Sequence, residues 1–345
     1  MNMSGSWFER DTRCIAAHGQ PAALIDLCLQ RGINSHRLLR GTGLFHEDVL
    51  RGDTLVSPEQ FFQLIDNARQ LLDADDSAFL FGQRLLPGPL GAASQALSLA
   101  ANLQQALELL VELRTLLFPL LSPRLLLDEQ HAYLHWQDNC GAGHQFRFLV
   151  EAAMAAVIAM SRRLGGERLP WQIHLRHARP RYIEQYWVHL GEDLHFASPY
   201  DLMRLPRACL TRPWPQSAPT AALVAGQQAR AELQRLPATH SLLDALYRWL
   251  LDHARQAPGL EHAADAFGMS PATFKRKLKK HDTCYQEQHD QARLHLALYL
   301  YQIKGYSNDE VAAYLRFHDA TNFRRSFKRW TGLAPSALLL AMRGR

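Results

Sequence analysis

The sequence predicts an α+β domain followed by an all-α domain. Its 345 residues favour two domains, because one hydrophobic core seldom serves more than about 250–300 residues. Between residues 124 and 205 short alternating stretches stand among segments of helical spacing, which predicts strands mixed with helices. From residue 241 onward the spacing is almost wholly helical.

Charge divides the chain at nearly the same place. Residues 1–239 carry 22 arginines and no lysine against 23 acidic residues, a net charge of −1. Residues 240–345 carry 16 lysines and arginines against 10 acidic residues, a net charge of +6. This asymmetry indicates a near-neutral domain joined to one that binds a polyanion. A basic surface that is merely solvated is the alternative.

Composition limits the remaining function classes. The five cysteines are scattered, without a CxxC pair or the Cys/His spacing of a zinc site, so no disulfide framework or structural metal is expected. The N-terminus lacks a signal-peptide apolar segment, and the longest apolar run, 152–160, is too short to cross a bilayer. We therefore expect a soluble cytoplasmic protein without a cofactor or a membrane partner.

Helices dominate the segment before the first predicted strand. Ser57, Pro58 and Glu59 are typical of a helix start, as cap, first residue and early acid. The stretch 87–89, Pro-Gly-Pro, breaks the chain. The predicted helices cover residues 21–31, 57–72, 91–101 and 103–118.

Alternation then predicts a hairpin whose strands, 124–127 and 131–136, flank a turn at 128–130. Beyond the hairpin, the pattern returns to helical spacing and alternates again in short stretches. The further predicted elements are helices over 146–164 and 180–190 and strands over 171–176, 194–196 and 200–205.

No catalytic motif occurs in this first part. A Gly-rich phosphate loop, GxSxG, HExxH and paired carboxylates at a catalytic spacing are all missing. The pairs His131/His135 and His174/His177 are candidate metal ligands. Residues three apart on a strand do not share a face, so the second pair is excluded, and ordinary hydrogen-bonded histidines are the preferred interpretation.

Residues 216–240 are expected to connect the two domains. The Ala- and Gln-rich stretch 220–236 predicts a connecting or dimerising helix, and 237–240 predicts a hinge. The expected domains are therefore residues 1–215 and residues 241–345, on either side of this connection.

A capped basic helix over 271–280 is the most informative segment of the sequence. Ser270 is a favourable N-cap, and Pro271 suits the first helical position. Phe274 and Leu278 are four apart, so they share an inward face, and lysine and arginine fill the outer face. With a short helix before it and Gly268 in the turn, the segment 260–280 predicts a helix-turn-helix.

The pattern recurs over 307–330. Phe323 and Phe327 repeat the inward pair at an offset of 49 residues, and the ten residues from Ala264 to Phe274 match the ten from Ala313 to Phe323. A single helix over 285–303 joins the two motifs. Such a module can present both second helices to successive major grooves, about 34 Å apart.

These motifs resemble the AraC/XylS family of bacterial transcription regulators over about residues 241–342. The resemblance rests on Ala264, Gly268, Met269, Ser270, Pro271, Phe274, Arg276, Leu278 and Lys279, and later on Val311, Ala312, Leu315, Phe317, Phe323, Arg325, Phe327, Lys328, Arg329, Trp330, Gly332 and Pro335. The upstream part resembles the family's arabinose-binding-like sensor domain, in the subgroup that includes regulators of ornithine and arginine catabolism and of virulence.

The resemblance implies which side chains contact DNA. Base contacts would come from Ala272, Lys275, Arg276, Ala320, Thr321, Asn322 and Arg325. Phosphate contacts would come from Lys279, Lys280, Arg324, Lys328 and Arg329. The aromatic residues and leucine of the motifs, Phe274, Leu278, Phe317, Phe323, Phe327 and Trp330, are expected in the core.

Two positions depart from the family pattern. Arg316 stands where the second turn usually has glycine, so either this turn is built differently or Arg316 adds a backbone contact. The arginine that usually follows the final proline is also missing, since Ser336 to Leu339 follow Pro335. Sequence specificity is therefore expected to depend mostly on Lys275 and Arg276.

The resemblance implies a regulator of transcription, by family default an activator. It implies that residues 1–215 sense an effector and dimerise and that residues 241–345 bind DNA. The implied partners are double-stranded promoter DNA, RNA polymerase and a small-molecule effector, and the implied assembly is a homodimer. Two other functions remain open: a constitutive or architectural DNA-binding protein without ligand control, and a DNA-repair enzyme fused to a helix-turn-helix module. An alkyl-transfer enzyme of that kind needs a reactive cysteine in a polar setting with histidine, and no Pro-Cys-His run occurs.

Overall fold

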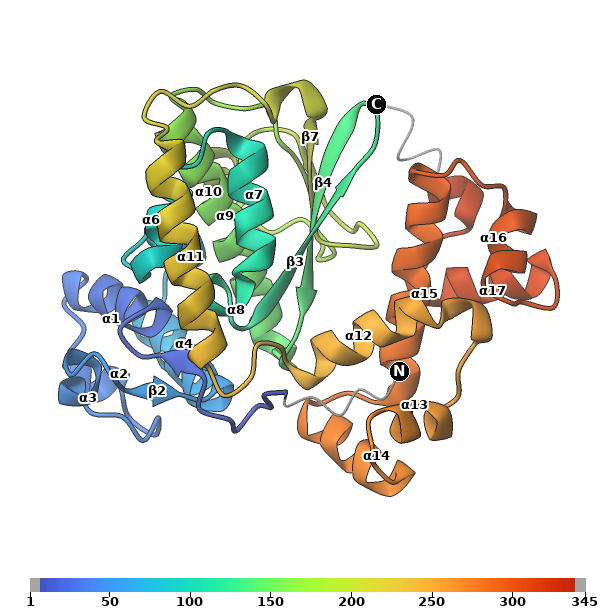
Figure 1. Ribbon diagram of the computed structural model, residues 1–345, viewed down its shortest axis with the longest axis horizontal. Coiled ribbons are helices and arrows are strands. Elements are labelled where there is room, and N and C mark those ends of the chain that lie inside the picture. Colours follow the sequence, from blue (N-terminus) through green and yellow to red (C-terminus); the bar gives the residue numbers. More distant parts are fainter. Residues whose placement is uncertain (1–6, 339–345) are drawn as a thin grey trace. The chain divides into compact units, whose positions relative to one another are not determined.

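A computed structural model describes residues 7–338 (Figure 1). Contacts divide the chain into a first unit, Trp7–Ser241, and a second unit that begins at Leu242. The first unit combines a sheet with helices and the second is helical, so the predicted fold class is confirmed. The outer limits of the predicted domains, residues 1 and 345, lie outside the described residues.

A five-stranded sheet in the order β3-β4-β7-β5-β6 lies at the centre of the first unit. Its members are β3 (Leu121–Leu127), β4 (His131–Asp138), β5 (Gln172–His174), β6 (Leu194–His195) and β7 (Leu202–Pro206). The predicted hairpin is confirmed: β3 and β4 pair antiparallel. Its turn is closed by the Asp128 carboxylate, which accepts hydrogen bonds from the backbone N–H groups of Gln130 and His131, at 2.7 and 2.5 Å.

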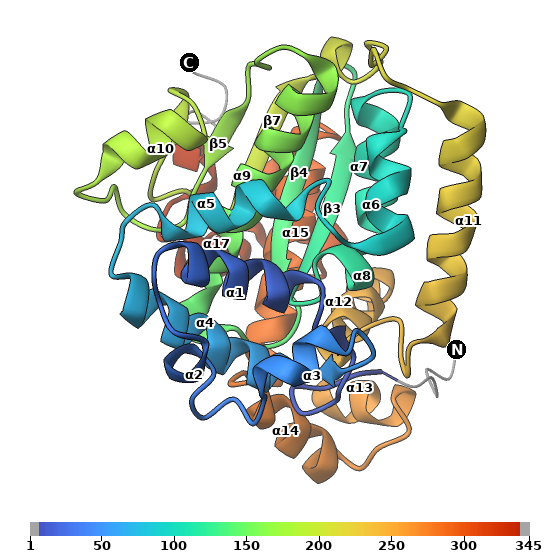
Figure 2. The same ribbon diagram turned by 90° about the vertical axis from the view of Figure 1, so that its left-hand side faces the viewer.

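The helices of this unit lie in front of the sheet and beside it in the view of Figure 2. They are α1 (Gln20–Gln30), α2 (Ser35–Leu38), α3 (His46–Leu50), α4 (Pro58–Leu72), α5 (Ser77–Leu85), α6 (Gly91–Ser98), α7 (Leu103–Glu112), α8 (Arg114–Leu117), α9 (Phe146–Gly165), α10 (Ile183–His189) and α11 (Pro219–Arg235). A two-stranded sheet, β1 (Ile15–Ala16) with β2 (Leu55–Val56), lies near α1 and α4 in sequence. Buried residues of the sheet and of α9 belong to one continuous core.

Several short elements were missed by the sequence analysis. They are α2, α3, α5 and the strands β1 and β2. Elements this short carry little periodicity and depend on tertiary packing. Other boundaries also differ: the helix predicted over 103–118 is divided at Leu113 into α7 and α8, and the helix predicted from residue 180 begins at Ile183.

The connecting segment packs on the first unit. Helix α11 lies alongside α6 (Figure 1), and Arg230 on α11 forms an ion pair with Glu112 on α7, at 2.5 Å. The stretch predicted as a hinge is also held there: the Thr115 hydroxyl donates to the Thr239 carbonyl at 2.6 Å. The contacts therefore group residues 216–241 with the first unit.

The second unit consists of helices. They are α12 (Leu242–Asp252), α13 (Leu260–Ala266), α14 (Pro271–Lys280), α15 (Tyr285–Gln302), α16 (Asn308–Tyr314) and α17 (Ala320–Thr331). Helix α15 joins the two motifs and contacts both. At its start the Tyr285 hydroxyl donates to the carbonyl of Pro258, just before α13, at 2.6 Å. Near its end, Tyr301 packs on Phe323 and Phe327, with ring centroids 6.2 and 6.0 Å away. No helix among residues 7–338 is long and apolar enough to cross a membrane.

Candidate nucleic-acid interface and ligand pocket

The first helix-turn-helix is built as its sequence predicts. Helix α13 ends at a tight turn in which Gly268 has φ +66°, a conformation that favours glycine. The N–H of Gly268 bonds to the Asp265 carbonyl and that of Met269 to the Ala264 carbonyl, both at 2.9 Å. The Ser270 hydroxyl then caps α14 by accepting from the Thr273 N–H.

Helix α14 has one buried face and one exposed face. Phe274 and Leu278 are completely buried. The predicted base-contacting residues, Ala272, Lys275 and Arg276, are exposed, as are the predicted phosphate-contacting residues Lys279 and Lys280. The two anchors fix the rotation of the helix about its axis, so the basic face is held outward in the folded unit.

The second turn has the same geometry as the first, although Arg316 replaces glycine. Arg316 has φ +57°, and its N–H bonds to the Ala313 carbonyl as the next N–H, of Phe317, bonds to Ala312. The idea that this turn is built differently is therefore wrong. Arg316 does make a backbone contact, because its Nε donates to the Arg255 carbonyl at 3.1 Å.

The predicted register between the two motifs needs correction by one residue. Ala312 accepts the turn hydrogen bond that Ala264 accepts in the first motif, and Ala312 is buried whereas Ala313 is exposed. The structural partner of Ala264 is therefore Ala312, not Ala313. Asp319 caps α17, and the second motif has one more residue between its turn and this cap than the first motif has before Ser270. Counting back from Phe323, as the sequence comparison does, misses this insertion.

Helix α17 repeats the division into two faces. Phe323 and Phe327 are completely buried. Most of its predicted DNA-contacting residues are exposed, namely Thr321, Asn322, Arg324, Arg325, Lys328 and Arg329, and Ala320 is half-buried.

Two of these residues already have partners inside the protein. The Asn322 amide donates to the Asp319 carboxylate at 3.1 Å, and Arg329 forms an ion pair with Asp290 at 3.0 Å. DNA contacts by Asn322 and Arg329 would compete with these bonds.

Phe317 and Trp330 are half-buried instead of belonging to the closed core. Both flank Arg293 on α15, whose guanidinium lies 4.1 Å from the Phe317 ring centroid and 6.0 Å from that of Trp330. Arg293 also donates to the Leu315 carbonyl at 2.5 Å. These contacts attach the second turn to the linking helix and give Arg293 a structural role.

Substitutions at Arg316 should separate backbone strain from the hydrogen bond. Arg316→Gly should match or exceed the wild-type stability, because glycine removes a left-handed strain of about 1–2 kcal/mol. Arg316→Ala should be the least stable of the three proteins, since it keeps the strain and loses the bond to Arg255. Equilibrium urea denaturation of the full chain measures this order. An alanine variant as stable as wild type would show that the bond contributes nothing.

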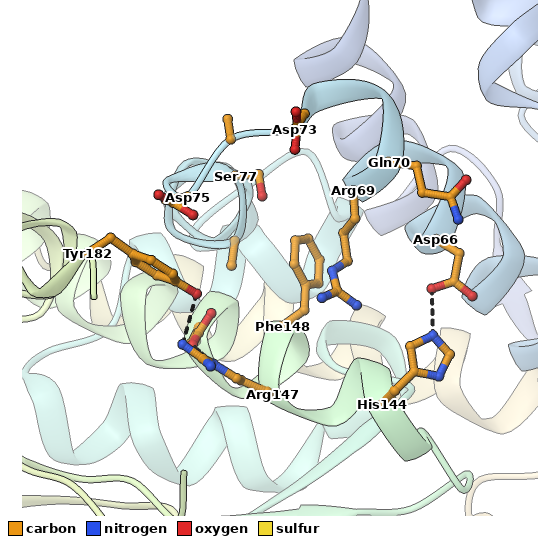
Figure 3. A pocket seen from close by; sticks show the side chains of 13 residues that line it. Asp66, Arg69, Gln70, Asp73, Asp75, Ser77, His144, Arg147, Phe148 and Tyr182 are labelled. Carbon is orange, nitrogen blue, oxygen red and sulfur yellow. Dashed lines mark hydrogen bonds and ion pairs between the residues drawn. The ribbon is translucent and has the colours of Figure 1, made fainter. Parts of the chain in front are cut away.

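A pocket of about 420 Å³ opens in the first unit between α4, α5 and α9. Asp66, Arg69 and Gln70 on α4 and the turn 73–76 form one side (Figure 3). His144, Arg147 and Phe148 form the opposite side, with Tyr182 at the edge. This pocket was not found from the sequence, because its lining comes from three separate segments.

A hydrogen-bonded charge network forms the base of the pocket. Glu151, whose side chain is 7% exposed, pairs with Arg147 at 2.6 Å and accepts a hydrogen bond from the Tyr186 hydroxyl. Arg147 Nη2 donates to the hydroxyls of Tyr182 and Tyr186, at 2.9 and 2.8 Å. Burial and the Glu151 carboxylate raise the pKa of both tyrosines. Arg147 is therefore held in one orientation.

The histidine pairs do not form a metal site. Among residues 7–338, no three His, Cys, Asp or Glu side chains lie close enough to hold an ion. The His174 ring stacks on His195 at 4.5 Å, and burial lowers the pKa of His174 to about 4. All five cysteines are free thiols, and Cys284 alone is exposed.

Comparison with known proteins finds transcription regulators that are similar to this chain. The ornithine utilization regulator of Pseudomonas aeruginosa is 29% identical over 321 residues, which cover 91% of this chain and 93% of that protein. An HTH-type transcriptional regulator of Mycobacterium bovis is 25% identical over 144 residues, 42% of each chain. The crystal structure of the transcriptional regulator CdpR from P. aeruginosa covers 92% of this chain and 96% of its own, at 20% identity and a TM-score of 0.39.

Two family models match the two units separately. The model of the arabinose-binding N-terminal domain of AraC transcription regulators matches residues 32–214, which is more than half of the chain. A helix-turn-helix domain model matches residues 263–340 and includes both second helices, α14 and α17. The chain therefore belongs to the AraC family of transcription regulators.

Proposed function

We propose that this regulator binds promoter DNA sequence-specifically and activates transcription when a small-molecule effector binds its first unit. The observation that carries the proposal is the pair of basic helices, α14 and α17. Each has two completely buried anchors and exposes a row of lysines and arginines. Arg276 and Arg325 would read guanine, and Lys279, Lys280, Arg324 and Lys328 would contact phosphates.

The other partners follow from this role. Activation implies contact with RNA polymerase, and a protein that acts on promoter DNA works in the cytoplasm. A homodimer is supported by α11, where Leu223 is 61% and Val224 50% exposed, since large exposed apolar side chains side by side often mark an interface. We propose no catalytic activity and no cofactor for the chain.

The effector is the least defined part of the proposal. The name of the P. aeruginosa relative connects that protein with ornithine utilization, and on this ground amino acids are the first ligands to test. The main alternative is a regulator that binds DNA constitutively.

Genome-wide mapping of bound sites, followed by transcription from the bound promoters, tests the proposal. We expect a small number of strong sites and a promoter output that changes with one metabolite of the neighbouring genes. A flat distribution over the genome would contradict sequence-specific binding. Specific sites whose output ignores every such metabolite would favour the constitutive alternative.

A further inference from the structure

We propose that the pocket between α4, α5 and α9 binds an amino acid with a cationic side chain. The inference rests on the proposed function in one respect: the ligand is the effector of a DNA-binding regulator. The evidence is the charge that remains in the pocket once its internal pairs are formed.

Two pairs of side chains in the pocket bond to each other. Arg147 pairs with Glu151 at 2.6 Å, and His144 Nε2 lies 2.9 Å from the Asp66 carboxylate. Three charged side chains that line the pocket have no ion-pair partner among the described residues: Arg69, Asp73 and Asp75. One positive and two negative charges, all on exposed side chains, therefore line the cavity without an ion pair.

The complement of this set is a ligand with one carboxylate and two cationic groups. A free amino acid with an amine or guanidine in its side chain carries just these charges at neutral pH. A pocket of about 420 Å³ is within the range of about 300–1,000 Å³ that is usual for small-molecule sites. A ligand with the opposite charges would form ion pairs with these solvated groups and be selected over ligands that lack them.

The carboxylate would lie between Arg69 and Arg147. Arg69 extends from α4 into the space beside Phe148 (Figure 3), with its guanidinium carbon 5.9 Å from that ring's centroid. Arg147 uses Nε and Nη2 for Glu151, Tyr182 and Tyr186, so its Nη1 group remains available to a ligand. Because those bonds fix the guanidinium, little side-chain entropy is lost when a carboxylate binds.

The cationic groups would lie at the turn between α4 and α5. Asp73 and Asp75 stand there on the opposite side of the pocket from Arg147 (Figure 3). The two carboxylates at the turn and the Arg147 guanidinium on α9 lie on opposite sides, with Arg69 extending from α4 between them. This arrangement gives the site a direction, which distinguishes an amino acid from a simple diamine or a simple acid. Specificity of this kind comes from groups that stay unpaired when the wrong ligand enters.

Calorimetric titration of the full chain tests the inference with a matched set of ligands. The probes are L-ornithine, L-lysine and L-arginine, together with putrescine, 5-aminopentanoate and L-norvaline. Relative to ornithine, these three lack the carboxylate, the α-amine and the side-chain amine in turn. We expect at least one basic amino acid to bind, and each deletion to weaken binding at least tenfold compared with ornithine or the preferred homologue. Equal binding of norvaline or putrescine would overturn the proposed recognition.

Substitutions of the pocket residues then test whether the ligand binds at this site. Arg69→Ala and the double change Asp73→Asn with Asp75→Asn should each weaken binding at least tenfold. Arg51→Ala and Asp53→Asn alter an exposed pair outside the pocket, with side chains 66% and 70% exposed, and should leave binding unchanged. Unchanged affinity in the pocket variants would overturn the site.

DNA binding is measured in the same preparations to separate the two proposals. If no basic amino acid binds a wild-type protein that still binds its operator, the ligand inference fails and the DNA-binding function stands. If the amino acid binds the pocket but promoter output does not respond, the site stands and effector control fails.

Discussion

Gly82→Ala is expected to destabilise the first unit by about 3 kcal/mol, the upper part of the range for overpacked cores. Gly82 lies inside α5 where this helix crosses α9. A Cβ at this position would overlap the backbone carbonyl of Ala152 and lie 2.9 Å from its Cα. Ala152 is itself buried within the core, so α9 cannot move away without disturbing the packing on its other faces.

Gly226→Ala provides a control of opposite sign. Gly226 lies in α11, and the nearest atom to its added Cβ is Arg230 Nη1, the end of a flexible side chain at 3.4 Å. Gly226 is buried, but no backbone atom blocks the added methyl group, so alanine in this helix should stabilise by about 0.5–1 kcal/mol. Urea denaturation of both variants measures the difference. Similar small effects at the two positions would show that the crossing of α5 and α9 tolerates a methyl group.

The same crossing positions the pocket. Helix α5 begins with Ser77 in the pocket wall, and α9 carries Arg147. Gly82→Ala should therefore also weaken ligand binding, because it displaces these two helices.

The DNA-binding unit could be predicted almost completely because its signals are local. Ser270 caps its helix as predicted, and Ser307 and Asp319 cap theirs in the same way, while aromatic or aliphatic pairs four apart mark the buried faces. Two details escaped. The extra residue between the second turn and α17 changes no periodicity, and the carbonyl that accepts from the Arg316 side chain is more than sixty residues away in sequence.

The pocket could not be predicted because no single segment of the sequence contains all the residues that form one of its sides. Its lining comes from residues 66–78, from 144–151 and from Tyr182, which meet only through the packing of α4, α5, α9 and the chain before α10. One local signal existed. Arg147 and Glu151 stand one turn apart, directly before the apolar run 152–160, and a charge pair next to such a run indicates either a buried pair or a site.

Arg276→Ala is expected to weaken binding to the operator by about 1–3 kcal/mol, the value of a bidentate arginine–guanine contact. Binding to random DNA should change little. Arg276 is exposed on α14 between Phe274 and Leu278, both completely buried. The substitution therefore removes a surface group without loosening the helix, and a selective loss can be assigned to base reading.

Lys280→Ala is the matched control, because Lys280 is expected to contact phosphate. It should weaken operator and random DNA alike and reduce the slope of log K against log salt by about 0.9. Titrations of both DNAs at several salt concentrations distinguish the two cases. Equal losses on the two DNAs for Arg276→Ala would remove Arg276 from the base-contacting residues.

Arg329→Ala should have a smaller effect than Lys280→Ala, because Arg329 must first leave Asp290, 3.0 Å away, before it can contact phosphate.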